Sequence, residues 1–183
     1  MIKTTAELLA TYGSHYGIDK AVSLGMLTKV GHGLYSDEAP DLSEVEAICA
    51  IYPNAIMTLE SAFAFHDLSD FVPDRYTFAT PLNAHRIRNE KVTQMFMSNE
   101  IIRIGVMESK SERGVIRVYD KERMLIELFR LRSKLPPDYF REVVNSYRRL
   151  AEEEGVDFRG LSAYCNKFKK GALIKTRIEE VIL

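Results

Sequence analysis

Asp74 and the Glu108-Ser109-Lys110 segment are the residues whose types and spacing could carry out catalysis. Metal-dependent nucleases use two carboxylates to hold a divalent cation and a lysine to polarise the attacking water. Here Asp74 precedes its predicted strand, and Glu108 and Lys110 begin a charged run that ends at Gly114, where solvated side chains are the default. We therefore interpret the three residues as surface residues, and a metal-dependent nuclease is a distant alternative.

No other catalytic template stands out. Gly13-Ser14 lacks the downstream Asp-x-Asp pair that a nucleotidyltransferase needs for its metals. His66 follows an apolar helix, so we interpret it as a helix-end residue rather than a general base. Cys49 and Cys165 fall on apolar helix stripes without metal-ligand spacing, which predicts reduced core residues. The sequence thus predicts no catalytic residues, no metal site and no cofactor.

The segment Ser14-His15-Tyr16-Gly17, with Lys20 one turn later, could bind DNA. The first residues of a recognition helix point at base edges in the major groove, and Lys20 is placed for a phosphate. Ser14 is equally suited to cap a helix, and Tyr16 to pack against a neighbour. Lys29 and His32 fall on the next predicted hairpin, where they could contact the DNA backbone or belong to an ordinary turn.

A second candidate surface is basic. Residues 83–134 contain 12 Lys or Arg against seven Asp or Glu. Arg86 and Arg88 fall in a predicted loop, and Arg103 and Arg117 on predicted strands. A solvated sheet face explains this pattern, and a surface for a polyanion or a protein partner is the alternative.

The whole-chain composition indicates a soluble globular protein. Of the 183 residues, 46% are hydrophobic and 28% charged, and no stretch approaches the length of a membrane span. The first residues lack the features of a secretory signal, so we expect a cytoplasmic protein without a membrane partner. Residues 1–82 hold four basic and 11 acidic residues, whereas residues 83–183 hold 21 and 15. The basic half is therefore not the half with the DNA-binding pattern, which predicts weak phosphate neutralisation by the N-terminus.

The elements that must position these residues begin with two short helices. Thr5 is a candidate cap for the first, which stops at Gly13, and Ser14 for the second, which ends at Gly25. Met26–Val30 and Leu34–Ser36 then predict a β-hairpin. A helix pair followed by a hairpin is the outline of a winged helix.

Beyond Asp41, which with Glu44 resembles a capping box, the sequence predicts an α+β domain. A helix is expected from Asp41 to Tyr52 and another at Leu59–His66. A small antiparallel sheet of about three or four strands is expected, and a helix-rich C-terminal part follows, with clear 3.6-residue periodicity. The predicted strands are Arg75–Thr80, Ile101–Met107 and Val115–Tyr119, and the predicted helices are Lys121–Arg132, Pro137–Glu154, Phe158–Phe168 and Ala172–Ile182. We expect two domains, 1–40 and 41–183, that pack together.

The order of several short motifs resembles the AbiEi antitoxin family of bacterial type IV toxin–antitoxin (abortive infection) systems. At the N-terminus the motifs are Thr4-Thr5-Ala6-Glu7-Leu8, Leu24-Gly25-Met26-Leu27 and Gly33-Leu34-Tyr35. Further on, Ser61-Ala62-Phe63-Ala64-Phe65-His66-Asp67-Leu68 is similar to a helix of that family, and Val118 to Arg123 to its strand-to-helix junction. The resemblance covers nearly the whole chain.

This resemblance implies a winged-helix N-terminus that binds operator DNA and represses its own operon. It also implies a C-terminal domain that counteracts a nucleotidyltransferase-like toxin encoded beside it. Ser14 to Gly17 and Lys20 would lie on the recognition helix, and Lys29 and His32 on the wing. Family members usually carry an additional helix before the Thr4-Thr5 segment, so we expect a truncated winged helix-turn-helix without its first helix. A protein- or RNA-binding module that has lost operator binding is the alternative.

Overall fold

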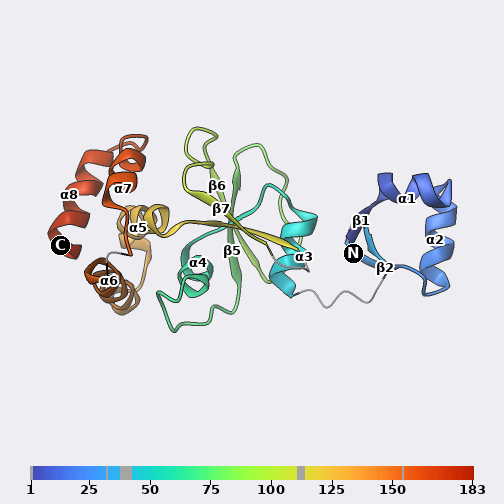
Figure 1. The fold of residues 1–183 in the computed structure, drawn as a ribbon, viewed down its shortest axis with the longest axis horizontal. Helices are drawn as coiled ribbons and strands as arrows, with labels where there is room; N and C mark the ends of the chain where they lie inside the picture. The colour runs from blue at the N-terminus through green and yellow to red at the C-terminus, as the bar shows by residue number, and fades with distance from the viewer. Residues whose placement is uncertain (1, 32, 38–42, 111–113, 154) are drawn as a thin grey trace. The chain divides into compact units, whose positions relative to one another are not determined.

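The computed structural model describes residues 2–31, 33–37, 43–110, 114–153 and 155–183 (Figure 1). The chain divides into two compact units. The first runs to Pro53 and includes residues 109–116, and the second comprises residues 54–108 and 117–183. The predicted boundary near residue 40 lies in a segment outside the described residues. The structure groups the helix at residues 44–51 with the first unit, whereas it was expected in the second domain.

The first unit contains three short helices and a three-stranded sheet among its described residues. Its elements are β1 (Ile2–Thr4), α1 (Thr5–Tyr12), α2 (His15–Ser23), β2 (Thr28–Gly31), β3 (Leu34–Ser36) and α3 (Glu44–Ile51). The strand order is β1-β3-β2, and both pairs are antiparallel. The β2–β3 hairpin is confirmed, whereas β1 was not predicted, since three residues are too short to show an alternating pattern.

Local side-chain chemistry fixes the ends of α1 and α2. Thr4, rather than the expected Thr5, caps α1: its hydroxyl accepts from the Glu7 amide, and the Glu7 carboxylate accepts from the Thr4 amide. Gly13, in the left-handed region at φ 72°, ends α1. Ser14 caps α2 as predicted. Only two residues thus separate the helices.

The start of α3 differs from the sequence expectation. Ser43 and Glu46 form the capping box there, and Glu44 is the first helical residue. Asp41, the expected cap, lies outside the described residues. The buried Cys49 lies on this helix, and Cys165 is buried in the second unit, which confirms the predicted core positions of both.

The second unit contains most of the sheet and the longer helices. Its strands are β4 (Ile56–Met57), β5 (Tyr76–Pro81), β6 (Val92–Met97), β7 (Val106–Lys110) and β8 (Val115–Tyr119), the last two extending into the segment grouped with the first unit. Its helices are α4 (Leu59–Phe65), α5 (Lys121–Arg130), the 3₁₀ turn η1 (Arg132–Lys134), α6 (Pro137–Glu152), α7 (Phe158–Cys165) and α8 (Gly171–Ile182).

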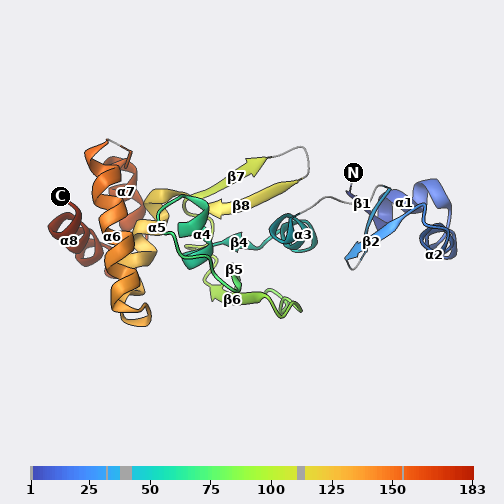
Figure 2. The same cartoon turned by 90° about the horizontal axis from the view of Figure 1, so that it is seen from below.

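The sheet of five strands is mixed, which corrects the expected small antiparallel sheet. Its order is β6-β5-β4-β8-β7. The β4–β5 pair is antiparallel, but β4–β8 and β5–β6 are parallel. The arrows of β7 and β8 run in opposite directions (Figure 2). Parallel pairs join strands through crossovers, so local turn signals did not reveal them.

Two parts of the predicted sheet differ in the structure. The expected strand Ile101–Met107 begins only at Val106, because residues 101–105 form turns in which the Ile104 amide donates to the Ile101 carbonyl at 3.2 Å. The strand β6 lies in the segment 81–99, in which no strand was predicted. Together these differences replace the first part of one predicted strand by turns and add a strand at the sheet edge.

The four helices after β8 gather at one end of the sheet (Figure 1). Their apolar faces follow the predicted periodicity, as on α6, where Val143, Val144 and Tyr147 are buried. The predicted α6 and α7 end somewhat earlier in the structure, and Glu154 lies outside the described residues. No helix in the described parts of the chain has the length and apolar character needed to cross a bilayer.

Candidate nucleic-acid interface

The amino-terminal half of α2 presents polar and aromatic side chains to solvent. Ile18 and Ala21 face the core, whereas His15, Tyr16 and Lys20 are exposed. Tyr16 is 77% exposed, so its ring has no packing role that would account for an aromatic residue at this position. Tyr16 and Lys20 are four residues apart and therefore share one face of the helix.

A small apolar core holds this helix in place. Leu8 of α1, Ile18 and Ala21 of α2, and Leu27 and Tyr35 around the hairpin form one buried cluster. The cluster ties both helices to the sheet, so the exposed face of α2 is attached to a packed scaffold rather than to a free helix.

Ser14 and Gly17, both predicted DNA contacts, also have structural roles. The Ser14 hydroxyl accepts from the Gly17 amide at 3.1 Å, which satisfies an otherwise free donor of α2. A Cβ atom on Gly17 would lie 2.4 Å from the Tyr12 carbonyl oxygen, so only glycine allows this approach of α1 and α2. The side chains left to meet a ligand are those of His15, Tyr16 and Lys20.

The hairpin supplies one further exposed cation. Lys29 is exposed on β2, just before the irregularity in register between Lys29 and Gly31. The other predicted wing residue, His32, lies outside the described residues. The Thr5 amide donates to the Gly33 carbonyl at 2.8 Å, and this bond fastens the end of the hairpin to the start of α1.

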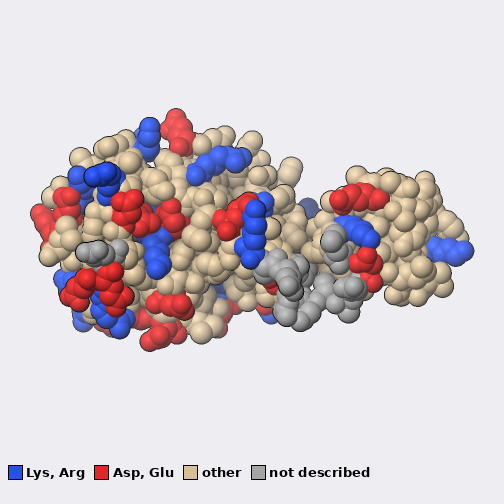
Figure 3. All heavy atoms as spheres, in the orientation of Figure 1, with Lys and Arg blue, Asp and Glu red and all other residues tan. Residues whose placement is uncertain are grey.

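The charges of the first unit are few and partly paired. The Lys3 ammonium donates to the Asp37 carboxylate at 2.6 Å, and this contact holds the pKa of Asp37 well below its ordinary value. Lys20 and Lys29 have no ion-pair partner among the described residues, so they are the lysines available to a phosphate. On the face shown in Figure 3, charged side chains are sparse on this unit.

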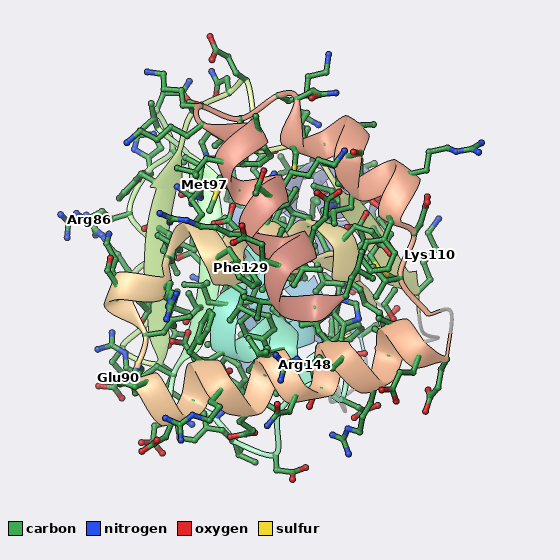
Figure 4. All side chains as sticks on the ribbon, turned by 90° about the vertical axis from the view of Figure 1, so that its left-hand side faces the viewer. Arg86, Glu90, Met97, Lys110, Phe129 and Arg148 are labelled. Atoms are coloured by element: carbon green, nitrogen blue, oxygen red, sulfur yellow. The ribbon has the colours of Figure 1, made fainter. Side chains whose placement is uncertain are left out.

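The four arginines predicted to bind a partner do not form one cluster. Arg86 and Arg88 are exposed in the connection between β5 and β6, and Figure 4 shows Arg86 pointing outward at the edge of the unit. Arg103 is exposed in the turn before β7, not on a strand. Arg117 lies on β8 and pairs with Glu108 at 3.2 Å.

The sheet order explains this dispersal. Two strands, β5 and β4, separate β6 from β8, and adjacent strands are about 4.8 Å apart. On the face shown in Figure 3, acidic and basic side chains are interspersed over the second unit. The basic excess of residues 83–134 therefore does not form a single patch on that face.

The residues of the nuclease alternative are also separated. Asp74 is exposed before β5, whereas Glu108 lies on β7, and the strands β4 and β8 run between them. Glu108 is paired with Arg117, and Lys110 is exposed. Within the described ranges, no group of three or more His, Cys, Asp or Glu residues is arranged to hold a metal ion.

Two of the segments that carry the family resemblance meet in the second unit. His66, which caps the C-terminal end of α4 as predicted, has its Nε2 atom 2.7 Å from the Tyr119 carbonyl oxygen. Burial lowers the pKa of His66, which favours the neutral ring. Next to Tyr119, Asp120 caps α5 and accepts from the Tyr164 hydroxyl at 2.9 Å. These side chains are satisfied by structural partners.

No protein-family model and no curated protein sequence matches this chain.

Proposed function

We propose that this protein is the transcriptional autoregulator and antitoxin of a toxin–antitoxin operon. In this proposal the first unit binds operator DNA as a winged helix. The second unit neutralises a nucleotidyltransferase-like toxin encoded beside it.

The exposed face of α2 is the observation that carries the DNA-binding part. Helix α2 follows α1 after the two-residue turn Gly13-Ser14 and precedes the β2–β3 hairpin. In helix-turn-helix proteins the second helix enters the major groove and its first residues contact base edges. Tyr16 and His15 stand at that end of α2, with Lys20 one turn on and Lys29 on the hairpin. We assign base contacts to the first two and phosphate contacts to the lysines.

The antitoxin part rests on the resemblance to the AbiEi family. The contact between His66 and the Tyr119 carbonyl supports it, because the two resembling segments form one packed substructure rather than two unrelated loops. The Thr58 hydroxyl is also directed at the Met124 sulfur, at 3.8 Å, which joins the start of α4 to α5.

A DNA titration at several salt concentrations tests the first part. Lys20→Ala combined with Lys29→Ala should weaken binding to the upstream region of its own operon. The double variant should also reduce the slope of log K against log salt by about 1.8, since each phosphate contact contributes about 0.9. The matched control is Lys167→Ala with Lys169→Ala, which removes the same charge from exposed sites in the second unit.

Equal affinity and slope for the wild type and the Lys20/Lys29 variant would remove the recognition-helix assignment.

The excess of acidic residues in residues 1–82 favours one second candidate, a protein- or RNA-binding module that has lost operator binding. Co-expression with the neighbouring toxin separates the two. Growth rescue by a chain that does not bind operator DNA would support the antitoxin part of the proposal and exclude the operator-binding part.

A further inference from the structure

The second unit contains a cleft between α6, η1 and α8 that the proposed function does not use. Its volume is about 360 Å³. Small-molecule sites are typically about 300–1,000 Å³, so the cleft can hold a ligand larger than a single anion. Arg132 of η1, Val144 of α6 and Val181 of α8 are among its lining residues.

Arginines dominate the polar lining of this cleft. Arg141, Asn145 and Arg148 follow one another at intervals of four and three residues, and so lie along one face of α6. Arg132 adds a third guanidinium from η1. None of the described residues that line the cleft is an Asp or Glu. The cleft therefore concentrates positive charge that the lining itself does not neutralise.

Two of these guanidinium groups are held in place by the protein. The Arg148 Nε atom donates to the Val181 carbonyl at 2.8 Å, and Figure 4 shows Arg148 between α6 and α8. The Arg132 guanidinium carbon lies 4.9 Å from the centre of the Phe140 ring. In the described parts of the chain neither contact engages the terminal nitrogen donors of these arginines, so the side chains are oriented before any ligand arrives.

The third arginine is held more loosely. Arg141 lies 3.8 Å from Asp138, and both side chains are largely exposed, so water screens this ion pair. An incoming anion can therefore recruit Arg141 without breaking a strong contact. This makes Arg141 the lining residue whose removal should perturb the ligand most selectively.

This donor set favours a phosphate over a carboxylate. Guanidinium groups form paired hydrogen bonds with both, but a carboxylate brings one negative charge to three cations. A di- or triphosphate brings more charge and more acceptor oxygens. The remaining lining is apolar, with Leu135, Val144 and Phe140 beside the arginines, and this surface suits an uncharged ring system attached to the phosphates.

We propose that this cleft binds a phosphorylated small molecule of the nucleotide class, a nucleoside di- or triphosphate. The phosphates lie against Arg132, Arg141 and Arg148, and the nucleoside covers the apolar lining. The site goes beyond the proposed function, since neither operator binding nor toxin neutralisation requires it.

Isothermal titration of the full chain with ADP, GDP, adenosine and pyrophosphate tests this proposal. ADP or GDP should bind at least about tenfold more tightly than adenosine or pyrophosphate, because only the nucleotides use both parts of the cleft. Arg141→Gln and Arg132→Gln should each weaken nucleotide binding by about tenfold or more, the usual effect of losing a hydrogen bond to a charged group.

Arg149→Gln is the matched control. Arg149 is the neighbour of Arg148 on α6, is exposed and is not among the described lining residues. All three variants change exposed side chains, and circular dichroism checks that each is folded. A dissociation constant above about 1 mM for both nucleotides would overturn the proposal. Adenosine or pyrophosphate binding as tightly as the nucleotides, or an equal effect of Arg149→Gln, would overturn it as well.

Discussion

Replacing Arg123 by methionine should destabilise the second unit strongly. The Arg123 side chain is fully buried, and its Nη2 atom lies 2.9 Å from the fully buried Glu127 carboxylate. Its Nη1 atom donates to the carbonyls of Ile101 and Ile104 at 2.6 Å and 3.0 Å. One side chain on α5 therefore satisfies the backbone of the turn that precedes β7.

We expect a loss of about 4 kcal/mol in the free energy of unfolding for Arg123→Met. Removing one member of a buried ion pair typically costs about 3–5 kcal/mol. The Glu127 carboxylate keeps its bond from Arg130 Nε at 2.9 Å, which limits the cost. Against this, the Ile104 carbonyl loses its Arg123 donor, and a carbonyl left without a donor costs about 1–3 kcal/mol, whereas the Ile101 carbonyl keeps its bond from the Ile104 amide. The variant also loses the contacts of the guanidinium with the Tyr119 and Phe168 rings, at 4.3 Å and 4.6 Å.

Urea unfolding followed by far-ultraviolet circular dichroism measures this loss, because α5 to α8 supply much of the helical signal. The control is Arg132→Met, which removes an exposed guanidinium group that contacts the Phe140 ring. This variant should lower the free energy of unfolding by less than about 1 kcal/mol. Hydrogen exchange gives a local measurement, since the Asp120 amide donates to the Gly105 carbonyl at 2.7 Å and should exchange faster in Arg123→Met. A loss below about 1 kcal/mol would refute the reasoning, since it would mean that well-packed methionine compensates the buried pair.

Three further predictions concern stability. Ser14→Ala should cost about 1 kcal/mol in thermal or urea unfolding through loss of the α2 cap, and Ser14→Gly should cost only a few tenths; equal costs would argue against the cap. Gly105→Ala should lower the free energy of unfolding by more than about 1 kcal/mol, because φ at this position is +71° and the new Cβ atom would lie 2.5 Å from the Arg123 Cβ atom. Unchanged stability would show that α5 can move to make room for the methyl group. Burial lowers the pKa of His66 below its ordinary value of 6.5, so just below pH 6.5 the unfolded chain binds more protons at this residue than the folded chain does. The stability of the wild type should therefore fall as the pH drops below 6.5. His66→Gln should flatten that part of the profile, measured by urea unfolding at a series of pH values, and an unchanged profile would exclude His66 as its source.

The elements best predicted from the sequence were those specified by local chemistry. Ser14 marks the start of α2 because an N-cap needs only its own side chain and an amide three residues on. The spacing of Val143, Val144 and Tyr147 predicted α6 for a similar reason, since one helix face is buried along its length. The hairpin of β2 and β3 followed from the glycines at its turn.

The elements that were missed depend on distant partners. Strand β6 alternates poorly, and its Gln94 side chain is half-buried and bonded to the Thr80 hydroxyl at 2.7 Å and the Ile87 amide at 2.9 Å. A glutamine used in this way has no signature in a hydrophobic pattern. Residues 101–105 carry isoleucines that suggest a strand, but Arg123 binds two of their carbonyls instead.

The candidate sites show the same division. The sequence left open whether Tyr16 packs or faces solvent, and the structure places Ile18 and Ala21 in the core and leaves Tyr16 and Lys20 exposed. The cleft around Arg148 was not foreseen, because α6, η1 and α8 meet there only through tertiary packing. The spacing of arginines along one face of α6 was its only sequence signal.

The parallel pairing of Met57 with Val118 has a consequence for synthesis on the ribosome. Strand β4 acquires β5 as an antiparallel neighbour early, but its other edge stays open until β8 has left the exit tunnel. During that interval the open edge of the apolar strand β4 presents unpaired backbone groups, and such an edge can pair with strands of other chains. Pairings so far apart in sequence also form slowly, because a long loop must close first. The completion of this sheet is therefore the step of biosynthesis at which a chaperone would matter most.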